Sequence, residues 1–141
     1  MNRTLFASLA GLLAACVIGY LAYSQQLASD GTADFGVPMV DVIVPELGSD
    51  ERAGETAFNA FCAKCHGKNA GGRDGYGPPL VHEIYEPSHH ADISFLYAPT
   101  VGVRAHHWPY GNMPSIPGIT EAETALVLKY ARALQVANGI E

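Results

Sequence analysis

The stretch Cys62-Ala63-Lys64-Cys65-His66 decides what this chain folds around. Two cysteines three positions apart, with a histidine directly after the second, form the attachment pattern of a c-type haem. Each thiol adds to one vinyl group of the porphyrin, and the histidine supplies a ligand to the iron. We therefore predict one covalently bound haem c on Cys62 and Cys65, with His66 as the proximal iron ligand.

The two cysteines could instead form a redox-active pair or half of a zinc site, or their spacing could be chance. A thioredoxin-like pair is expected in a βαβ context, and a cysteine-rich zinc site is expected to have a second cysteine pair. Neither feature is found, and the one further cysteine, Cys16, lies in an apolar N-terminal run. The pattern therefore favours haem attachment.

Met113, in Gly111-Asn112-Met113-Pro114, is the leading candidate for the sixth iron ligand. A thioether is a soft ligand that suits haem iron opposite a histidine, and the Met/His pair raises the reduction potential. The rival methionine, Met39, lies upstream in a predicted linker. His106 or His107 in place of Met113 would lower the potential.

Several landmarks of residues 49–138 match a known family position by position, and the chain resembles a monohaem class I cytochrome c of the membrane-anchored bacterial type. A small residue and an aromatic residue precede the haem motif, a Gly-Pro-x-Leu loop follows it, and an aromatic residue stands in the last helix. These landmarks are Gly54, Phe58, Gly77-Pro78-Pro79-Leu80 and Tyr130.

The resemblance implies an all-α cytochrome c fold of three to four helices around one haem. It implies that Tyr130 of the last helix packs on the first helix, which carries Gly54 and Phe58. It also implies that the carbonyl of Pro78 accepts a hydrogen bond from the ring of His66, which places Pro78 in the cofactor site.

Three helices are expected from local patterns. The first begins with Ser49 as N-cap and leads to Cys62. The second runs from Ser88 as N-cap to Ala98, where Pro99 ends or kinks it. The third begins at a capping box of Thr120 and Glu123 and ends at Asn138-Gly139.

Residues 1–24 are expected to form a membrane anchor or a signal peptide. The run from Leu5 to Tyr23 carries no charge and follows Arg3. As a helix rising about 1.5 Å per residue it is about 28 Å long, close to the ~30 Å bilayer core. Cleavage near Ala22-Tyr23-Ser24 and lipidation of Cys16 are the alternatives. Each places the haem domain, residues 49–141, outside the cytoplasm, on the periplasmic side of the inner membrane.

Residues 25–48 are predicted to be a linker. Pro38 and Pro45 bracket an extended, β-branched piece, residues 39–44. Because an isolated strand cannot satisfy its own backbone, we expect this piece to lie against the domain or a partner.

The net charge of −6 argues against a nucleic-acid partner, because no basic stripe is present to neutralise phosphates. Lys64, Lys68 and Arg73 cluster around the haem motif. They form either a docking patch or a solvated face, and the second interpretation is favoured slightly.

Histidines are unusually dense between the haem motif and Met113. Adjacent histidines are good ligands for copper or zinc. A His-His pair on a helix, however, splays its side chains by about 100°, and no carboxylate cluster completes a shell. Surface or propionate-facing roles are therefore favoured, and the N–H of Trp108 or the hydroxyl of Tyr110 is a candidate donor to a propionate. The histidines are His82, His89, His90, His106 and His107.

These features predict a one-electron carrier and not an enzyme, because an iron with both axial positions filled offers no open site to a substrate. Its partners would be redox proteins in or at the membrane of a respiratory chain, which it serves as a tethered shuttle or as a subunit of a larger oxidoreductase. The alternatives are a haem enzyme or a gas or redox sensor with a weak sixth ligand, and a copper- or zinc-handling protein built on the histidines.

Overall fold

The computed structural model describes residues 16–21 and 35–141 and divides the chain into two units, 1–34 and 35–141. In the first unit, residues 16–21 are helical and Cys16 is exposed. The rest of the predicted anchor, the cleavage site at 22–24 and the linker up to residue 34 lie outside the described residues. Within the described ranges, no helix combines the length and apolarity needed to cross a bilayer.

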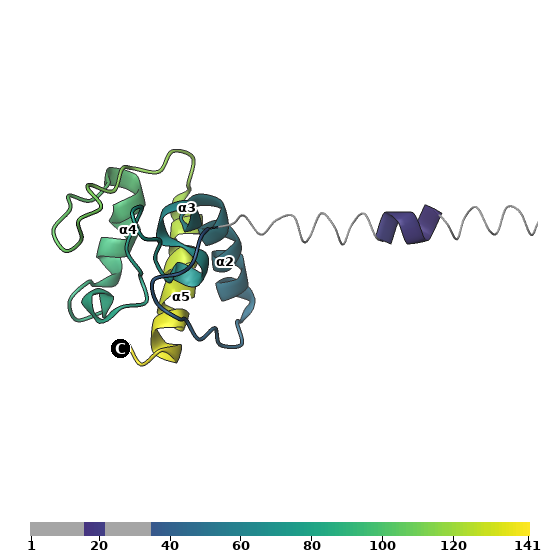
Figure 1. Cartoon of the computed structure of the whole chain (residues 1–141), viewed down its shortest axis with the longest axis horizontal. Coiled ribbons are helices and arrows are strands. Elements are labelled where there is room, and N and C mark those ends of the chain that lie inside the picture. The colour runs from purple at the N-terminus through teal and green to yellow at the C-terminus, as the bar shows by residue number, and fades with distance from the viewer. Residues whose placement is uncertain (1–15, 22–34) are drawn as a thin grey trace, which may run out of the picture. The chain divides into compact units, whose positions relative to one another are not determined.

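The second unit is built from helices, as Figure 1 shows. Its described residues form no β-strand, only three isolated bridges. The predicted all-α class is therefore confirmed for this unit. In chain order the elements are α2 (Ser49–Phe61), α3 (Ala63–His66), the 3-10 turns η1 (Lys68–Ala70) and η2 (Glu83–Tyr85), α4 (Asp92–Val101) and α5 (Glu121–Ala137).

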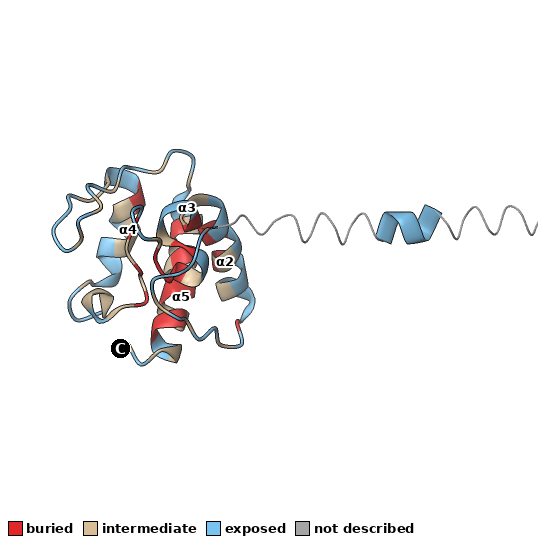
Figure 2. Ribbon diagram, viewed as in Figure 1, coloured by how far each residue is buried: buried red, intermediate tan, exposed pale blue. Residues whose placement is uncertain are grey.

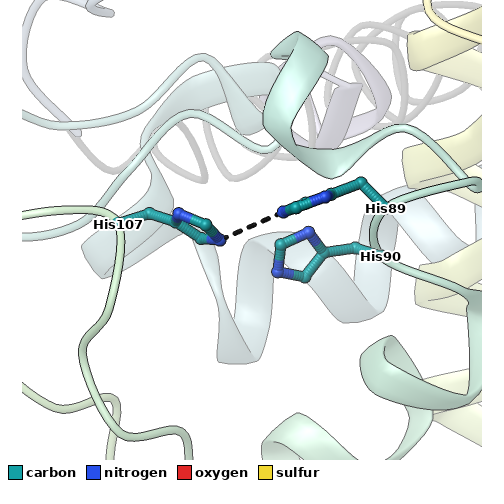
Figure 3. A group of neighbouring side chains, drawn as sticks. All are labelled: His89, His90 and His107. Carbon is teal, nitrogen blue, oxygen red and sulfur yellow. Dashed lines mark hydrogen bonds between the residues drawn. The ribbon is translucent and has the colours of Figure 1, made fainter.

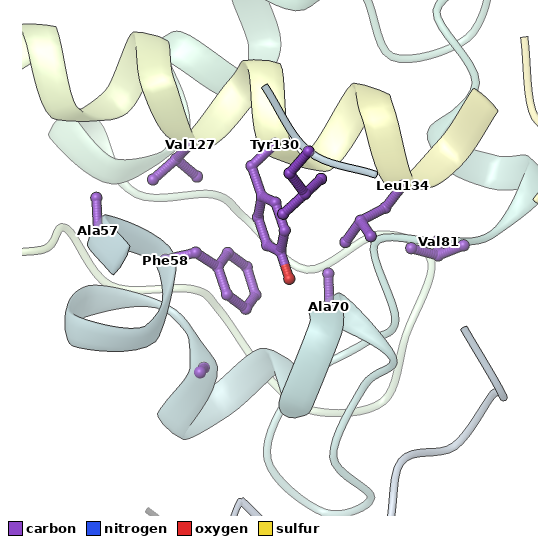
Figure 4. Close-up of a cluster of buried hydrophobic side chains, with 9 residues drawn as sticks. Ala57, Phe58, Ala70, Val81, Val127, Tyr130 and Leu134 are labelled. Carbon is purple, nitrogen blue, oxygen red and sulfur yellow. The ribbon is translucent and has the colours of Figure 1, made fainter. Parts of the chain in front are cut away.

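The core forms where α2 crosses α5. Phe58 and Tyr130 are both 0% exposed, and their ring centroids lie 5.6 Å apart at a tilt of 56° (Figure 4). Gly54 lies one turn before Phe58, so close to α5 that a Cβ there would be 2.1 Å from the carbonyl oxygen of Leu126. The helix pair that the resemblance implies is confirmed, and a glycine is what permits the two backbones to approach this closely.

The buried face of α5 includes polar residues that a hydrophobic pattern does not mark. Gln135 is 0% exposed, and its Nε2 donates to the carbonyl of Leu80 at 2.7 Å. This bond ties α5 to the loop that follows the haem motif, because a buried amide must find a partner. Figure 2 shows the buried residues concentrated along α5 and the parts of the chain that pack on it.

The predicted ends of α5 are confirmed. The hydroxyl of Thr120 accepts a hydrogen bond from the backbone N–H of Glu123, and the carboxylate of Glu123 accepts one from the backbone N–H of Thr120. The helix closes at Ala137, with Asn138 as C-cap and Gly139 at a φ of 76°.

The starts of two other helices differ from prediction. Ser49 is the first residue of α2 and Gly48 is its N-cap, so the Ser49 side chain makes no capping bond. Helix α4 starts at Asp92 and not near Ser88, because the Ser88 hydroxyl donates to the Glu86 carboxylate at 2.7 Å within the preceding turn.

The end of α4 differs as well, because Pro99 lies inside the helix. An interior proline removes one helical hydrogen bond and its ring crowds the carbonyl four residues earlier, although its fixed φ is compatible with a helix. The helix continues to Val101, and the N–H of Gly102 bonds to the carbonyl of Ala98 at 2.9 Å.

Residues 35–48, the second part of the predicted linker, lie against the haem domain. Leu47 is 7% exposed and belongs to the core cluster, on which Phe35 and Val42 also pack. The backbone of Ile43 exchanges two hydrogen bonds with the side chain of Asn138, at 3.0 and 2.9 Å. This extended segment thus finds in the domain the hydrogen bonds that it cannot make alone.

Candidate haem site

The haem motif lies at the junction of α2 and α3. The N–H of Cys62 bonds to the carbonyl of Phe58 at 2.7 Å, and the N–H of His66 bonds to the carbonyl of Cys62 at 2.9 Å. Cys62 and His66 are therefore one helical turn apart and project on the same side. Cys62 is half-buried and Cys65 is exposed, and neither forms a disulfide.

The ring of His66 is held by the loop that the resemblance pointed to. Its Nδ1 lies 2.9 Å from the carbonyl oxygen of Pro78. A carbonyl can only accept, so Nδ1 carries the proton and Nε2 keeps a free lone pair. Burial lowers the pKa of His66 and outweighs the Pro78 hydrogen bond, which raises it. The lowered pKa favours the neutral imidazole, which can bind a metal through Nε2.

A cavity of about 560 Å³ opens beside this ring, within the size range of cofactor sites. Cys62, His66 and Met113 all line it, so the fold brings these three predicted site residues together. The rest of the lining includes the apolar side chains Leu80, Phe95, Ala98, Val103 and Val127.

Trp108 lines a smaller pocket that shares Pro78, Tyr85 and Met113 with this cavity. The Nε1 of Trp108 is buried and makes no hydrogen bond of regular geometry, and the Trp108 ring contacts His82 with centroids 5.2 Å apart. A nearby acceptor is the hydroxyl of Tyr85, whose pKa burial raises to about 12 and the Trp108 N–H lowers in part. An acceptor on a bound group would satisfy this donor, as expected for a haem carboxylate. Tyr110, the other candidate donor, instead points its hydroxyl at Asp74 and Met39, at 3.3 and 3.4 Å. An apolar cavity, the ring nitrogen of His66 and the thiol of Cys62 in the cavity lining fit haem c. The second thiol, that of Cys65, is exposed and is not among the residues that line the cavity.

The position of Met113 is fixed by its backbone. Met113 and Val103 exchange two hydrogen bonds of 2.9 Å each. A Cβ at Gly102 would lie 2.7 Å from the carbonyl oxygen of Met113, and Gly102 has a φ of 77°, so only glycine fits there. Met39 is not among the residues that line the cavity, and its sulfur accepts the Tyr110 hydroxyl.

Four of the five singled-out histidines line the same cavity: His89, His90, His106 and His107. His89 and His90 lie in a turn before α4 and not on a helix, so the expected helical splay of their side chains is wrong. Desolvation first, and then the neighbouring histidines, lower the pKa of His107. His82 is apart from them and accepts the N–H of Ile84 through Nδ1 at 3.2 Å.

Arg132 is a structural residue that sequence reasoning missed. From α5 its guanidinium donates to the carbonyls of Tyr85 and His90 and to the carboxylate of Asp92, at 2.8, 2.6 and 2.9 Å. It also lies over the ring of Phe95 at 4.6 Å. It therefore fixes the segment that forms one wall of the cavity. In the sequence, the one indication of this role was a positively charged residue next to the apolar positions of the last helix.

A redox or zinc-binding role for the cysteine pair gains no support from the structure. Burial first, and then the neighbouring Cys65, raise the pKa of Cys62 to about 12, whereas a redox-active pair needs a lowered pKa. In the described ranges the one candidate metal-binding group of His, Cys, Asp and Glu side chains consists of histidines alone, so no further ligands complete a zinc site on the cysteines.

Comparison with known proteins gives the same assignment. The family model described as "Cytochrome c" matches residues 51–135. No curated protein and no solved structure matches the chain significantly. The matched range covers the haem motif, the cavity walls and nearly all of α5. The chain therefore belongs to the cytochrome c family, as a class I, haem-based electron carrier whose Cys62-Ala63-Lys64-Cys65-His66 motif attaches haem c.

Proposed function

We propose that this protein carries single electrons with His66 and Met113 as the two axial ligands of its haem iron. The observation that supports this most is that both side chains line one cavity, each held by short backbone hydrogen bonds. Pro78 fixes the ring of His66, and Val103 fixes the backbone of Met113. Because both ligands are held in place by the fold, their positions change little between the ferric and ferrous states, which suits rapid electron transfer.

The chain's own residues tune and protect this site. The bound haem supplies the one-electron chemistry, as its iron alternates between ferric and ferrous states. The hydrogen bond from His66 to Pro78 sets the tautomer and raises the basicity of the ligating nitrogen. The apolar walls exclude water, and the N–H of Trp108, in the adjoining smaller pocket, is a candidate donor to a haem carboxylate. With both axial positions occupied, no open coordination site is left for a substrate.

Carbon monoxide binding tests the axial pair. The reduced wild-type protein should not bind carbon monoxide at neutral pH, whereas Met113→Ala should bind it readily and lose the charge-transfer band of sulfur-ligated ferric haem. Met39→Ala is the matched control, because Met39 lies outside the cavity lining, and it should behave as wild type.

Two results would contradict the proposal. Ready carbon monoxide binding by the wild type would indicate a haem enzyme or a gas sensor. Unchanged spectra in Met113→Ala would point to a histidine from the same cavity, His106 or His107, as the sixth ligand.

The proposed site of action is the periplasmic face of the inner membrane, with redox proteins in or at the membrane as partners. The uncharged run from Leu5 to Tyr23 supports this, since its length suits a bilayer core. Anchoring would raise the effective concentration at a fixed partner, for a shuttle and for a complex subunit alike. Resistance of the full chain to alkaline extraction from membranes is expected, and recovery in the soluble fraction, with residues 1–24 still present, would contradict it.

A further inference from the structure

Three imidazoles from two separate segments of the chain meet in the lining of the cavity. His89 and His90 come from the turn before α4, and His107 comes from the loop that leads to Met113 (Figure 3). One ring nitrogen from each lies within 4.8 Å of the others. Within the described residues this is the group of side chains with the spacing to hold a metal ion.

The closest pair already has the spacing of two metal ligands. The Nε2 atoms of His89 and His107 lie 3.4 Å apart. Two nitrogens bound to one tetrahedral zinc at about 2.0–2.1 Å lie about 3.3–3.4 Å from each other. An ion between these rings would therefore need little movement of either.

The third ring is oriented as a metal ligand usually is. Nδ1 of His90 lies 2.6 Å from the carbonyl oxygen of Ile84, so it donates its proton there and leaves the lone pair of Nε2 free. A ligating histidine commonly gives its second N–H to a backbone carbonyl in this way. Arg132 holds the same residue from behind, through the His90 carbonyl at 2.6 Å.

Ring contacts with centroids 4.9 to 5.3 Å apart and the hydrogen bond between His89 and His107 link these side chains, whereas burial and charge pairing do not account for the arrangement. His89 and His107 are exposed, so burial of their rings contributes little. No carboxylate takes part in the group, so an ion pair does not explain it either. A single cation would bind all three ring nitrogens, whereas the hydrogen bond between His89 and His107 uses only two of them, and imidazole nitrogen suits copper and zinc.

We propose that His89, His90 and His107 bind one divalent transition-metal ion of the copper–zinc class, separate from the haem iron. A fourth position remains for water or for His106, whose ring centroid lies 4.2 Å from that of His107. The site rests on the proposed ligation by Met113, because a His107 bound to the haem iron would not be available to a second metal; the carbon monoxide test of Met113→Ala examines that ligation separately.

Metal titration of the haem-loaded, chelator-treated protein tests the proposal. Calorimetry with Zn²⁺ should show one saturable site per chain, and Cu²⁺ should give an electron paramagnetic resonance spectrum split by three nitrogens. His89→Gln and His107→Gln should each weaken zinc binding by at least about 100-fold, because loss of a residue that merely orients a ligand already costs about 10–100-fold. His82→Gln is the matched control, since His82 is outside the group, and it should keep wild-type affinity.

Haem absorption and circular dichroism identify any variant that fails to fold, and the exposure of His89 and His107 makes both substitutions structurally mild. Absence of saturable zinc and copper binding in the haem-loaded protein would overturn the proposal. The same holds if His89→Gln and His107→Gln bind zinc as the wild type does. If these variants shift the reduction potential while the wild type takes up no metal, the rings serve the haem carboxylates instead.

Discussion

The close approach of α2 to α5 at Gly54 can be tested by a substitution. Whether the substitution raises or lowers the stability of the domain decides whether the contact exists. Gly54→Ala adds one methyl group to α2 where the backbone of α5 lies against it. The new Cβ would be 2.1 Å from the carbonyl oxygen of Leu126, 2.7 Å from its carbonyl carbon and 2.9 Å from Cβ of Tyr130. None of these atoms is the end of a flexible side chain, so the helices must separate to make room.

Two effects of opposite sign then compete. Alanine is the better helix former by about 1 kcal/mol, which by itself would stabilise α2. Forcing extra volume into a packed core costs about 1–3 kcal/mol, and backbone contacts this short place Gly54 at the upper end. We expect a net loss of about 2 kcal/mol, or a fall in Tm of about 8–16 °C for a domain of this size.

Thermal unfolding of the haem-loaded protein, followed by circular dichroism, measures the difference. The control is Ala53→Gly at the adjacent, exposed position of α2, which should cost about 1 kcal/mol through propensity alone. If Gly54→Ala is as stable as the parent or more stable, propensity outweighs packing, and the close contact of α2 with α5 does not exist as described.

Further predictions concern the loop contact and the cap of α5. Gln135→Leu should cost about 1–3 kcal/mol in urea unfolding, because the carbonyl of Leu80 loses its donor, and an unchanged midpoint would contradict this. Thr120→Val should cost about 1 kcal/mol by removing the N-cap, as chemical unfolding at neutral pH can show. Hydrogen bonds from the backbone and then the hydroxyl of Thr120 lower the pKa of Glu123. Because that pKa is lower in the folded state, the carboxylate contributes stability at neutral pH that is lost as pH falls through it. Glu123→Gln should therefore flatten the loss of stability in acid, and a curve parallel to the wild type would refute this assignment.

Sequence alone determined the features that depend on neighbours along the chain. The cysteines and histidine of the haem motif lie within five consecutive residues, so their chemistry requires no knowledge of the fold. The capping box of Thr120 and Glu123 spans one helical turn and was predicted from the same kind of local pattern. The bond between His66 and Pro78 spans a loop, and it was available only through the family resemblance.

The prediction of helix starts from local patterns failed at two serine residues. Ser49 and Ser88 are both good N-caps by residue type, yet neither caps a helix. Ser88 bonds to Glu86 instead, and the backbone of Ser49 is already helical. The energy differences between such choices are about 1 kcal/mol, so tertiary contacts decide them.

Only the tertiary structure decided which distant residues meet. Arg132 bonds to Tyr85 and His90, which are more than 40 positions away in the sequence. His107 lies within hydrogen-bond distance of His89, although 18 positions separate the two residues. Residues 35–48 likewise pack on a core that includes Val127, Tyr130 and Leu134, far along the chain. Such contacts arise because helices of complementary shape bury their faces together, and no spacing within one segment encodes that choice.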